Sequence, residues 1–267
     1  MAILRTLIPL VVLAAAILLL ACQPAGKKQR QKDRDAADGA SSRTGKEAYA
    51  QERAQMVDDQ LRRRDIVDER VLGAMGRVPR HEFVAEDLAP MAYTDGPLPI
   101  GYDQTISQPY IVALMTQLVR PEPGDRALDV GTGSGYQAAV LAKLVEKVYS
   151  IEIIEPLADE AAARLARLGI TNVVVKAGDG YRGWPEHAPF DVIILAAAPT
   201  EIPEPLIEQL APGGRLVLPV GDLHQELVLV EKDEDGAVRR RRGIPVRFVP
   251  MTGEAERQGD ASRERRR

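Results

Sequence analysis

A glycine-rich segment, Asp129-Val-Gly-Thr-Gly-Ser-Gly135, has the residue types and spacing of a ligand-binding loop. Glycines at positions 131, 133 and 135 allow a tight turn and let a ligand approach the backbone without meeting a Cβ atom. A dinucleotide-binding fingerprint, G-x-G-x-x-G, would need a third glycine at position 136, where this chain has Tyr136. The spacing disfavours a dehydrogenase, and it leaves a set of candidate contacts for a different ligand: Asp129, Gly131, Gly133, Ser134 and Gly135.

Acidic residues follow the next two predicted strands. Glu152 lies about 20 residues beyond the loop, where a carboxylate can accept hydrogen bonds from ribose hydroxyls. An isolated glutamate would be taken as a solvated side chain, but this spacing favours a ligand contact. After the third strand, Asp179 can bond an adenine amino group, and Gly180 leaves space for the ring. The G-x-G-x-G loop is typical of methyltransferases, so the three strand ends together predict S-adenosyl-L-methionine as the ligand.

These residues need a framework that brings the strand ends together. Apolar runs predict strands at 127–131, 148–154, 173–176, 190–197 and 215–220 and helices between them at 136–145, 157–168 and 205–210. Two further helices are predicted from about Ala48 onward, with an apolar stripe between Met56 and Met75. Strands separated by helix-length crossovers indicate an α/β fold with a doubly wound, mostly parallel sheet, Rossmann-like as in methyltransferases. Residues 226–231 and 244–249 predict an antiparallel hairpin at the sheet edge. In such sheets, ligands bind at the carboxyl ends of strands.

Composition narrows the classes of function. The chain has 267 residues, 45% of them apolar, which suffices for one large domain with extensions and excludes wholesale disorder. The net charge of −4 gives no global electrostatic reason to expect nucleic acid binding. A single cysteine, Cys22, excludes an intrachain disulfide and a cysteine-based zinc site. The histidines are far apart in sequence, so no metal site is predicted.

The amino-terminal residues 1–22 have the pattern of a targeting signal. Arg5 precedes an apolar run that is short for a membrane-spanning helix, which needs about 20 apolar residues. Leu19-Leu-Ala-Cys22 resembles a bacterial lipoprotein box, which implies a lipidated Cys22 and membrane attachment. A plain secretory signal, an uncleaved anchor and a start codon further downstream remain alternatives. Beyond it we expect a disordered polar tether at 23–47, a methyltransferase domain at 48–252 and a disordered tail at 253–267.

Residues 50–252 resemble the protein-L-isoaspartate O-methyltransferases. The first and last matching segments are specific to that family, whereas the glycine loop and the Gly-Gly strand occur in methyltransferases generally. The matching segments are 104–110 (QTISQPY), 128–137 (LDVGTGSGYQ), 178–180 (GDG), 190–194 (FDVII), 196–199 (AAAP), 212–221 (PGGRLVLPVG) and 246–250 (VRFVP).

The resemblance implies an activity and further site residues. It implies methyl transfer from S-adenosyl-L-methionine to the α-carboxylate of L-isoaspartyl residues, and to a lesser degree D-aspartyl residues, which initiates repair of damaged proteins. Ser107 matches the family's active-site serine, Thr105 and Ile106 match neighbours that border the cofactor, and Thr252 matches a threonine near it. A monomer is expected. Family members are typically cytoplasmic and lack a signal, so the compartment stays open between the cytoplasm and a membrane-anchored lipoprotein.

Ser107 carries the mechanistic hypothesis. Its hydroxyl could donate a hydrogen bond to the attacking carboxylate, or it could cap a helix beginning near Pro109, since serine before proline is a common helix start. At the level of the whole protein, two other functions remain open. One is a methyltransferase for a different acceptor, such as a small molecule or RNA. The other is a non-catalytic envelope lipoprotein that keeps the fold, which a test of cofactor binding would separate from both enzymes.

Overall fold

The computed structural model describes residues 47–258 of the chain. The predicted signal and lipoprotein box at 1–22, the tether up to residue 46 and the tail beyond residue 258 lie outside the described residues. Nearly all described residues belong to one compact unit that begins at Tyr49.

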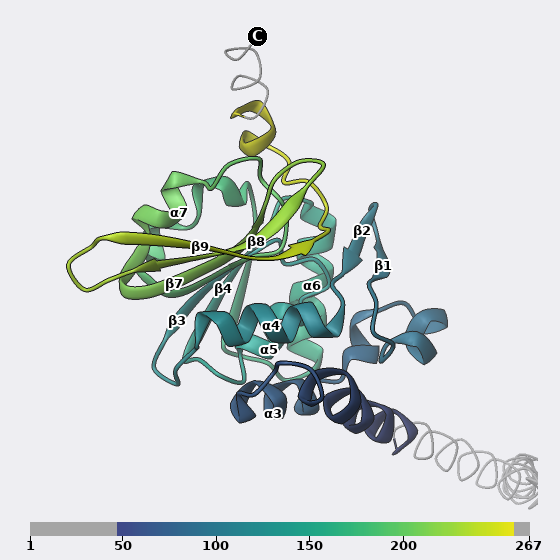
Figure 1. Cartoon of the computed structure of the whole chain (residues 1–267). Coiled ribbons are helices and arrows are strands. Elements are labelled where there is room, and N and C mark those ends of the chain that lie inside the picture. Colours follow the sequence, from purple (N-terminus) through teal and green to yellow (C-terminus); the bar gives the residue numbers. More distant parts are fainter. Residues whose placement is uncertain (1–46, 259–267) are drawn as a thin grey trace, which may run out of the picture. The chain divides into compact units, whose positions relative to one another are not determined.

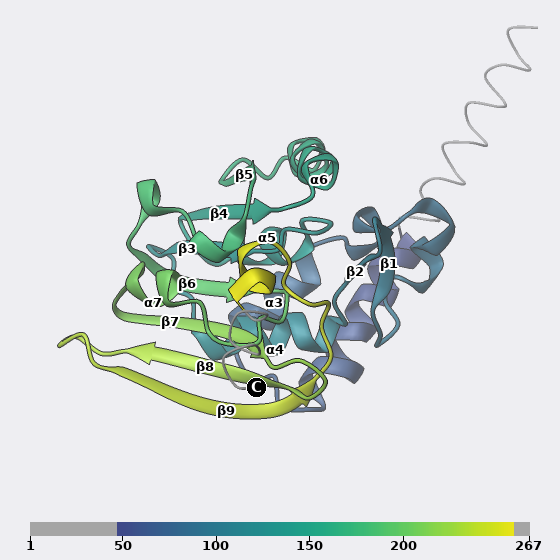
Figure 2. The ribbon, with the colours of Figure 1, turned by 90° about the horizontal axis from the view of Figure 1, so that it is seen from above.

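Seven strands form the central sheet, in the order β5-β4-β3-β6-β7-β8-β9 (Figures 1 and 2). The chain runs outward from β3 through β4 and β5 and then returns to place β6 beside β3, so the strand order reverses between β3 and β6. The first five strands in this order are mutually parallel, and β8 pairs antiparallel with both β7 and β9, which confirms the predicted doubly wound sheet with an edge hairpin. The strands are β3 (Arg126–Val130), β4 (Lys147–Glu152), β5 (Val173–Ala177), β6 (Phe190–Leu195), β7 (Leu210–Val220), β8 (Gln225–Lys232) and β9 (Val238–Val246).

Helices cover both faces of this sheet, which explains why apolar side chains predominate on both faces of its central strands. In β6, Val192 and Ile194 face one core, and Ile193 and Leu195 face the other. On the first side lie α3 (Glu69–Arg77), α4 (Pro109–Val119), α5 (Tyr136–Leu141), α6 (Glu155–Arg167) and the π-helical turn η1 (Met56–Arg62). On the second lie α7 (Glu204–Glu208) and the short 3₁₀ turns η4 (Gly180–Arg182) and η5 (Pro185–His187). Two further 3₁₀ turns are η2 (Arg80–Phe83) and η3 (Glu86–Met91).

The edge hairpin differs from its prediction in one strand. Its second strand was expected at 244–249, but β9 begins at Val238 and ends at Val246. The run of arginines at 239–242 has no apolar alternation, yet it pairs with β8 along an exposed edge. There the side chains reach acids on β8, as in Arg241 with Glu231 at 3.2 Å and Arg242 with Glu226 at 3.0 Å. The side chains of β9 therefore contact β8 through ion pairs, and they are not buried in the core.

A small hairpin upstream of the sheet was not predicted as strands. It consists of β1 (Leu98–Gly101) and β2 (Gln104–Ile106), joined by a turn in which Tyr102 and Asp103 have φ of 53° and 56°. Figure 2 shows it beyond the ends of the parallel strands. The Tyr102 hydroxyl donates to Glu160 Oε1 of α6 at 3.1 Å. This exposed bond joins the hairpin to α6, and Ile100 of β1 lies next to Gly133 of the glycine loop.

The carboxyl-terminal segment also packs on the domain, although a disordered tail was expected from Gly253 onward. Ala198 N donates to Val249 O at 2.8 Å, and Met251 N donates to Ala198 O at 2.9 Å. Residues 254–258 then form a helical turn whose Ala255 is buried. The sequence shows no large apolar residue there, but one small buried side chain and a few backbone hydrogen bonds order the turn.

Candidate active site

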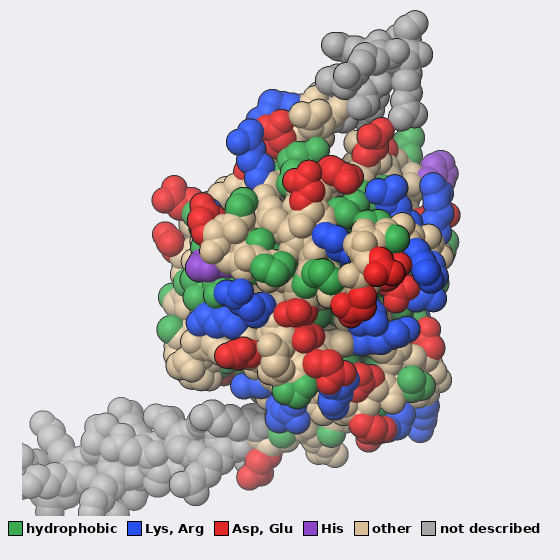
Figure 3. Space-filling model, turned by 90° about the vertical axis from the view of Figure 1, so that its left-hand side faces the viewer, with side chains coloured by type: hydrophobic (Ala, Val, Ile, Leu, Met, Phe, Trp, Pro, Cys, Tyr) green, Lys and Arg blue, Asp and Glu red, His purple; other side chains and the backbone are tan. Residues whose placement is uncertain are grey.

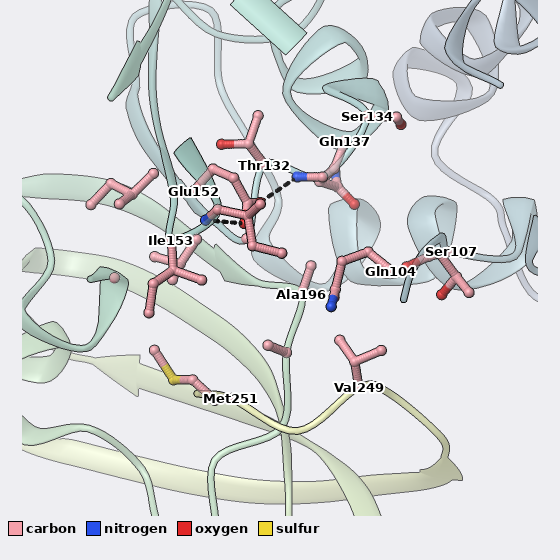
Figure 4. Close-up of a pocket in the computed structure, with 18 of the residues that line it drawn as sticks. Gln104, Ser107, Thr132, Ser134, Gln137, Glu152, Ile153, Ala196, Val249 and Met251 are labelled. Carbon is pink, nitrogen blue, oxygen red and sulfur yellow. Dashed lines mark hydrogen bonds between the residues drawn. The ribbon is translucent and has the colours of Figure 1, made fainter. Parts of the chain in front are cut away.

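A cavity lies at the carboxyl ends of β3, β4 and β6, where the strand order reverses (Figure 4). Its walls come from the β1–β2 hairpin, the glycine loop, the end of β4 and the segment 249–252. The structure thus brings together residues that are far apart in sequence. The predicted site residues that line the cavity are Thr105, Ile106, Ser107, Gly131, Gly133, Ser134, Glu152, Asp179, Gly180 and Thr252.

Glu152 is held at the end of β4 by the glycine loop. Its Oε2 atom accepts from Gly133 N at 2.8 Å, and its Oε1 atom accepts from Ile154 N at 3.1 Å (Figure 4). Gly133 has a φ of 53° and Gly131 a φ of 89°, values that favour glycine. Because a carboxylate has about four lone-pair positions, these two bonds orient Glu152 and leave capacity for the hydroxyls of a ligand.

Asp179 follows the neighbouring strand β5 and is fixed by two backbone donors. Its Oδ1 atom accepts from Tyr181 N at 3.0 Å, which caps η4, and its Oδ2 atom accepts from Glu254 N at 2.8 Å. The guanidinium of Arg257 approaches Oδ2 at 3.8 Å. The carboxyl-terminal turn therefore sets the position of this carboxylate. Its contact with an adenine amino group stays a prediction.

The charge of the cavity fits a cationic ligand. Among the described residues that line it, Glu152 and Asp179 are the charged ones, and Lys, Arg and His are absent. Two carboxylates would repel the pyrophosphate of a dinucleotide, but they suit ribose hydroxyls and a sulfonium cation. The remaining wall is largely apolar, with Val130, Ile151 and Met251. The residues present therefore fit S-adenosyl-L-methionine.

Two predicted contacts lie outside the cavity lining. Asp129 is fully buried beneath the loop, where its Oδ2 atom accepts from Ser150 Oγ at 2.7 Å, and Ser150 Oγ lies 2.6 Å from Thr132 Oγ1. Burial, aided by the charge of Glu152 and opposed by the Ser150 hydrogen bond, raises the pKa of Asp129 to about 7. Asp129 thus supports the loop from below, as its burial precludes a direct ligand contact.

Gly135 likewise serves packing. It has a φ of 89° at the amino-terminal cap of α5, and a Cβ atom there would lie 3.5 Å from Ala161 and Leu165 of α6. The third glycine of the loop therefore allows α6 to pack closely against the start of α5, and it does not line the ligand cavity.

Several lining residues were missed as individual contacts. Gln104 belongs to the matching segment 104–110, and Gln137 closes the matching segment at the glycine loop, so both could have been found from the resemblance. Ile153 and Met251 carry no chemical signal in the sequence. Only the fold places them beside the site, as their labels in Figure 4 show.

Ser107 lies at the junction of this cavity and a second one. Figure 4 shows Ser107 and Val249 toward one side of the site and Glu152 toward the other. Within the described part of the chain, its side chain makes no hydrogen bond, and Gln108 rather than Ser107 occupies the amino-terminal cap of α4. The capping role considered for Ser107 is therefore wrong. Its hydroxyl is free to meet a ligand.

The second cavity continues from the first. The two share Thr105, Ser107, Ala196 and Val249. The other residues lining the second cavity are Pro97, Gln108, Ile111, Pro245, Val246, Arg247 and Phe248. A ligand in the first cavity and a chain in the second would therefore meet beside Ser107.

Residues 47–258 contain neither a membrane-spanning helix nor a cluster of metal ligands. No helix there combines the length and the apolar character needed to cross a membrane. Nor do three His, Cys, Asp or Glu side chains gather to hold a metal ion in this part of the chain.

Comparisons with known proteins agree on one family. The sequence model of the protein-L-isoaspartate(D-aspartate) O-methyltransferases matches residues 51–256. A protein-L-isoaspartate O-methyltransferase 2 of Polaromonas sp. is 61% identical over 190 residues, covering 70% of this chain and 90% of the relative. Another protein of that name from Syntrophobacter fumaroxidans is 54% identical over 228 residues, covering 81% and 92%.

Solved structures give the same result. A protein-L-isoaspartate O-methyltransferase superposes with a TM-score of 0.71 at 30% identity, covering 78% of this chain and 69% of the other. A putative one from Plasmodium falciparum, solved with S-adenosyl-L-homocysteine, gives a TM-score of 0.65 at 28% identity, covering 75% and 98%. The sequence matches and the shared fold agree, and this chain therefore belongs to the protein-L-isoaspartate(D-aspartate) O-methyltransferase family.

Proposed function

We propose that this protein transfers a methyl group from S-adenosyl-L-methionine to the α-carboxylate of L-isoaspartyl residues, and of D-aspartyl residues, in damaged proteins. The observation that carries the proposal is the unengaged hydroxyl of Ser107 at the junction of two cavities. One cavity has the carboxylates that a sulfonium nucleoside requires, and the other gives an acceptor chain access to Ser107. The family match supports the same acceptor.

Methyl transfer to a carboxylate requires no general acid or base. The acceptor carboxylate has an unperturbed pKa of about 4 and is ionised at neutral pH, so it needs no general base. When bound, S-adenosyl-L-methionine supplies a methyl group on a sulfonium, and its transfer yields a methyl ester and S-adenosyl-L-homocysteine. Ser107 donates a hydrogen bond to one carboxylate oxygen and leaves the other directed at the methyl group. The alignment of both reactants by the whole site can lower the barrier by about 7 kcal/mol or more, and the Ser107 hydrogen bond supplies part of this.

The cofactor contacts follow from the walls of the first cavity. Glu152 accepts the ribose hydroxyls, and Asp179 accepts the adenine amino group beside Gly180. Gly131, Gly133 and Ser134 lie along the methionine portion, and Thr105, Ile106 and Thr252 close the remaining sides. Asp129 and Gly135 act indirectly, by shaping the loop.

The acceptor chain lies along the segment 246–250. Gln225 fixes this segment in an extended form, since its side chain donates to Phe248 O at 3.1 Å and accepts from Phe248 N at 2.6 Å. An extended backbone can recognise another backbone through main-chain hydrogen bonds, which tolerates many flanking sequences. Val249→Pro removes one main-chain donor and is expected to raise the KM for peptide. An unchanged KM would count against this mode.

The deciding experiment uses a chain that starts at Gln23. Transfer of labelled methyl from S-adenosyl-L-methionine to an isoaspartyl peptide is measured beside the matching aspartyl peptide. Base-labile label on the isoaspartyl peptide alone supports the proposal. Folded protein that binds the cofactor but labels neither peptide would direct attention to another acceptor, and absent cofactor binding would favour a non-catalytic role.

The amino-terminal pattern supports a second proposal, that Cys22 is lipidated and attaches the protein, as a monomer, to a membrane. The family resemblance supports a cytoplasmic location instead. Metabolic labelling with a fatty acid decides between them: label on the natural chain that disappears in Cys22→Ala supports the anchor. Unlabelled protein in the soluble fraction would overturn it.

A further inference from the structure

The charged lining residues of the two cavities have opposite signs. Within the described part of the chain, the charged residues that line the first cavity are Glu152 and Asp179, and the charged residue that lines the second cavity is Arg247. The rest of the second cavity is neutral, with the apolar side chains of Ile111, Val246 and Phe248 among its walls. A cation in a neutral cavity attracts an anion more effectively than one whose field is cancelled by neighbouring acids.

Arg247 is also unpaired, unlike most arginines nearby. On β9, Arg241 and Arg242 each lie within 4 Å of a glutamate on β8, at 3.2 Å and 3.0 Å. Arg247 is exposed and makes no ion pair or side-chain hydrogen bond within residues 47–258. Its guanidinium therefore keeps its donors, whose planar arrangement suits a carboxylate.

An anion bound at Arg247 would differ from the reacting carboxylate. The reacting group must reach the methyl donor in the first cavity, whose lining includes Ser107 but not Arg247. A guanidinium bonded to that carboxylate would also withdraw the electron density that attacks the methyl group. The arginine is instead placed to meet a neighbouring part of the same acceptor chain.

We propose that Arg247 binds the carboxylate side chain of an Asp or Glu adjacent to the isoaspartyl residue, so that the enzyme prefers acidic segments of damaged proteins. The inference rests on the proposed function and adds a specificity-determining residue to it. Arg247 acts on binding of the acceptor and leaves the reacting atoms untouched. Its effect therefore belongs in KM rather than kcat.

The test compares two isoaspartyl peptides that differ only in a neighbouring Glu or Gln. At low ionic strength the natural protein is expected to favour the Glu peptide about fivefold in kcat/KM, the size of effect typical of a partly exposed charge pair. Arg247→Gln should reduce the ratio to about one by raising the KM of the Glu peptide, and Arg247→Lys should keep part of it.

Arg240 provides the matched control. It is exposed on β9, makes no ion pair within residues 47–258 and does not line either cavity, so Arg240→Gln should keep the preference. Equal use of both peptides by the natural protein, or a preference that survives Arg247→Gln, would overturn the inference while methylation itself persists. Failure to methylate either peptide would instead overturn the proposed function, and this inference with it.

Discussion

At the scale of single residues, Ser107 is the most direct test of the site. Its hydroxyl makes no hydrogen bond within the described residues, so Ser107→Ala should leave the melting temperature unchanged. A hydrogen bond to a charged group contributes about 1.5–3 kcal/mol, and its loss should lower kcat/KM about 10- to 100-fold. Peptide methylation and thermal unfolding of the same preparation measure both. An unchanged kcat/KM would remove Ser107 from the mechanism.

The raised pKa of Asp129 predicts how the free energy of unfolding depends on pH. Its pKa is about 7 in the folded protein and about 3.8 when unfolded, so the unfolded chain ionises first. Its contribution to stability is fully present below about pH 3.8, falls as the pH rises and is lost once the pH exceeds about 7. Between pH 5 and pH 8 this loss is about 3 kcal/mol.

Asp129→Asn keeps an oxygen acceptor for Ser150 and removes the ionisation. The variant should therefore lose less stability than the natural protein when the pH is raised from 5 to 8. Denaturant unfolding at several pH values measures how steeply the free energy of unfolding falls with pH in each protein. A loss of stability caused by the substitution itself would be the same at every pH and would leave this slope unchanged. Parallel pH profiles would show that Asp129 ionises normally.

At the scale of elements, the carboxyl-terminal turn controls the cofactor cavity through Gly253. Its φ is 78°, and a Cβ atom there would lie 2.6 Å from Asp179 Oδ2 and 2.8 Å from Ile153 Cδ1. Gly253→Ala must displace these two lining residues, and we expect cofactor affinity to fall about tenfold, as for the loss of one good hydrogen bond. The KM for peptide should change little. Calorimetric titration with S-adenosyl-L-homocysteine measures the affinity.

Gly236 separates this effect from backbone strain. It has a φ of 85° in the β8–β9 turn, but a Cβ atom there meets nothing within 4 Å. Gly236→Ala carries a similar conformational cost without moving Asp179, so its cofactor affinity should equal that of the natural protein. Equal losses in both alanine variants would refute the positioning role of the turn.

The elements also show how far the sequence predicts the structure. The central strands were found because burial on both faces makes them rich in apolar residues, as in Val192–Leu195 of β6. The β1–β2 hairpin escaped because Pro99, Gly101 and Asp103 break any alternation, and pairing within the hairpin stabilises it. Glu152 was found by its spacing from the loop. Arg247 was not found, since its importance depends on which cavity it lines.

At the scale of the whole molecule, the helical segment at residues 47–55, which directly precedes η1, is part of the domain. Arg53 donates to Gly76 O at 2.8 Å and to the Tyr93 hydroxyl at 3.2 Å, and the Tyr49 ring stacks on His81 at 4.2 Å. A chain that starts at Met56 loses these contacts. It should unfold at a temperature several degrees lower than a chain that starts at residue 47, as a loss of about 1–2 kcal/mol predicts. Equal melting temperatures would show that residues 47–55 do not stabilise the domain.

Acidic and basic side chains lie side by side on the surface of the molecule, as they do on the β8–β9 hairpin. Figure 3 shows acidic and basic side chains intermingled over one face of the molecule. This agrees with the small net charge of −4 and with the pairs that join arginines of β9 to acids of the same hairpin. Selectivity for an acceptor therefore depends on single unpaired charges such as Arg247 rather than on the overall field.

The exposed strand β9 has a consequence for a protein that handles damaged chains. Damaged proteins expose extended segments, and an unpaired strand edge is a template on which such segments can add and aggregate. β9 presents four consecutive arginines at that edge, at positions 239–242, and charged side chains on an edge strand discourage further strand addition. We expect this edge to resist the addition of strands from partly unfolded acceptor proteins.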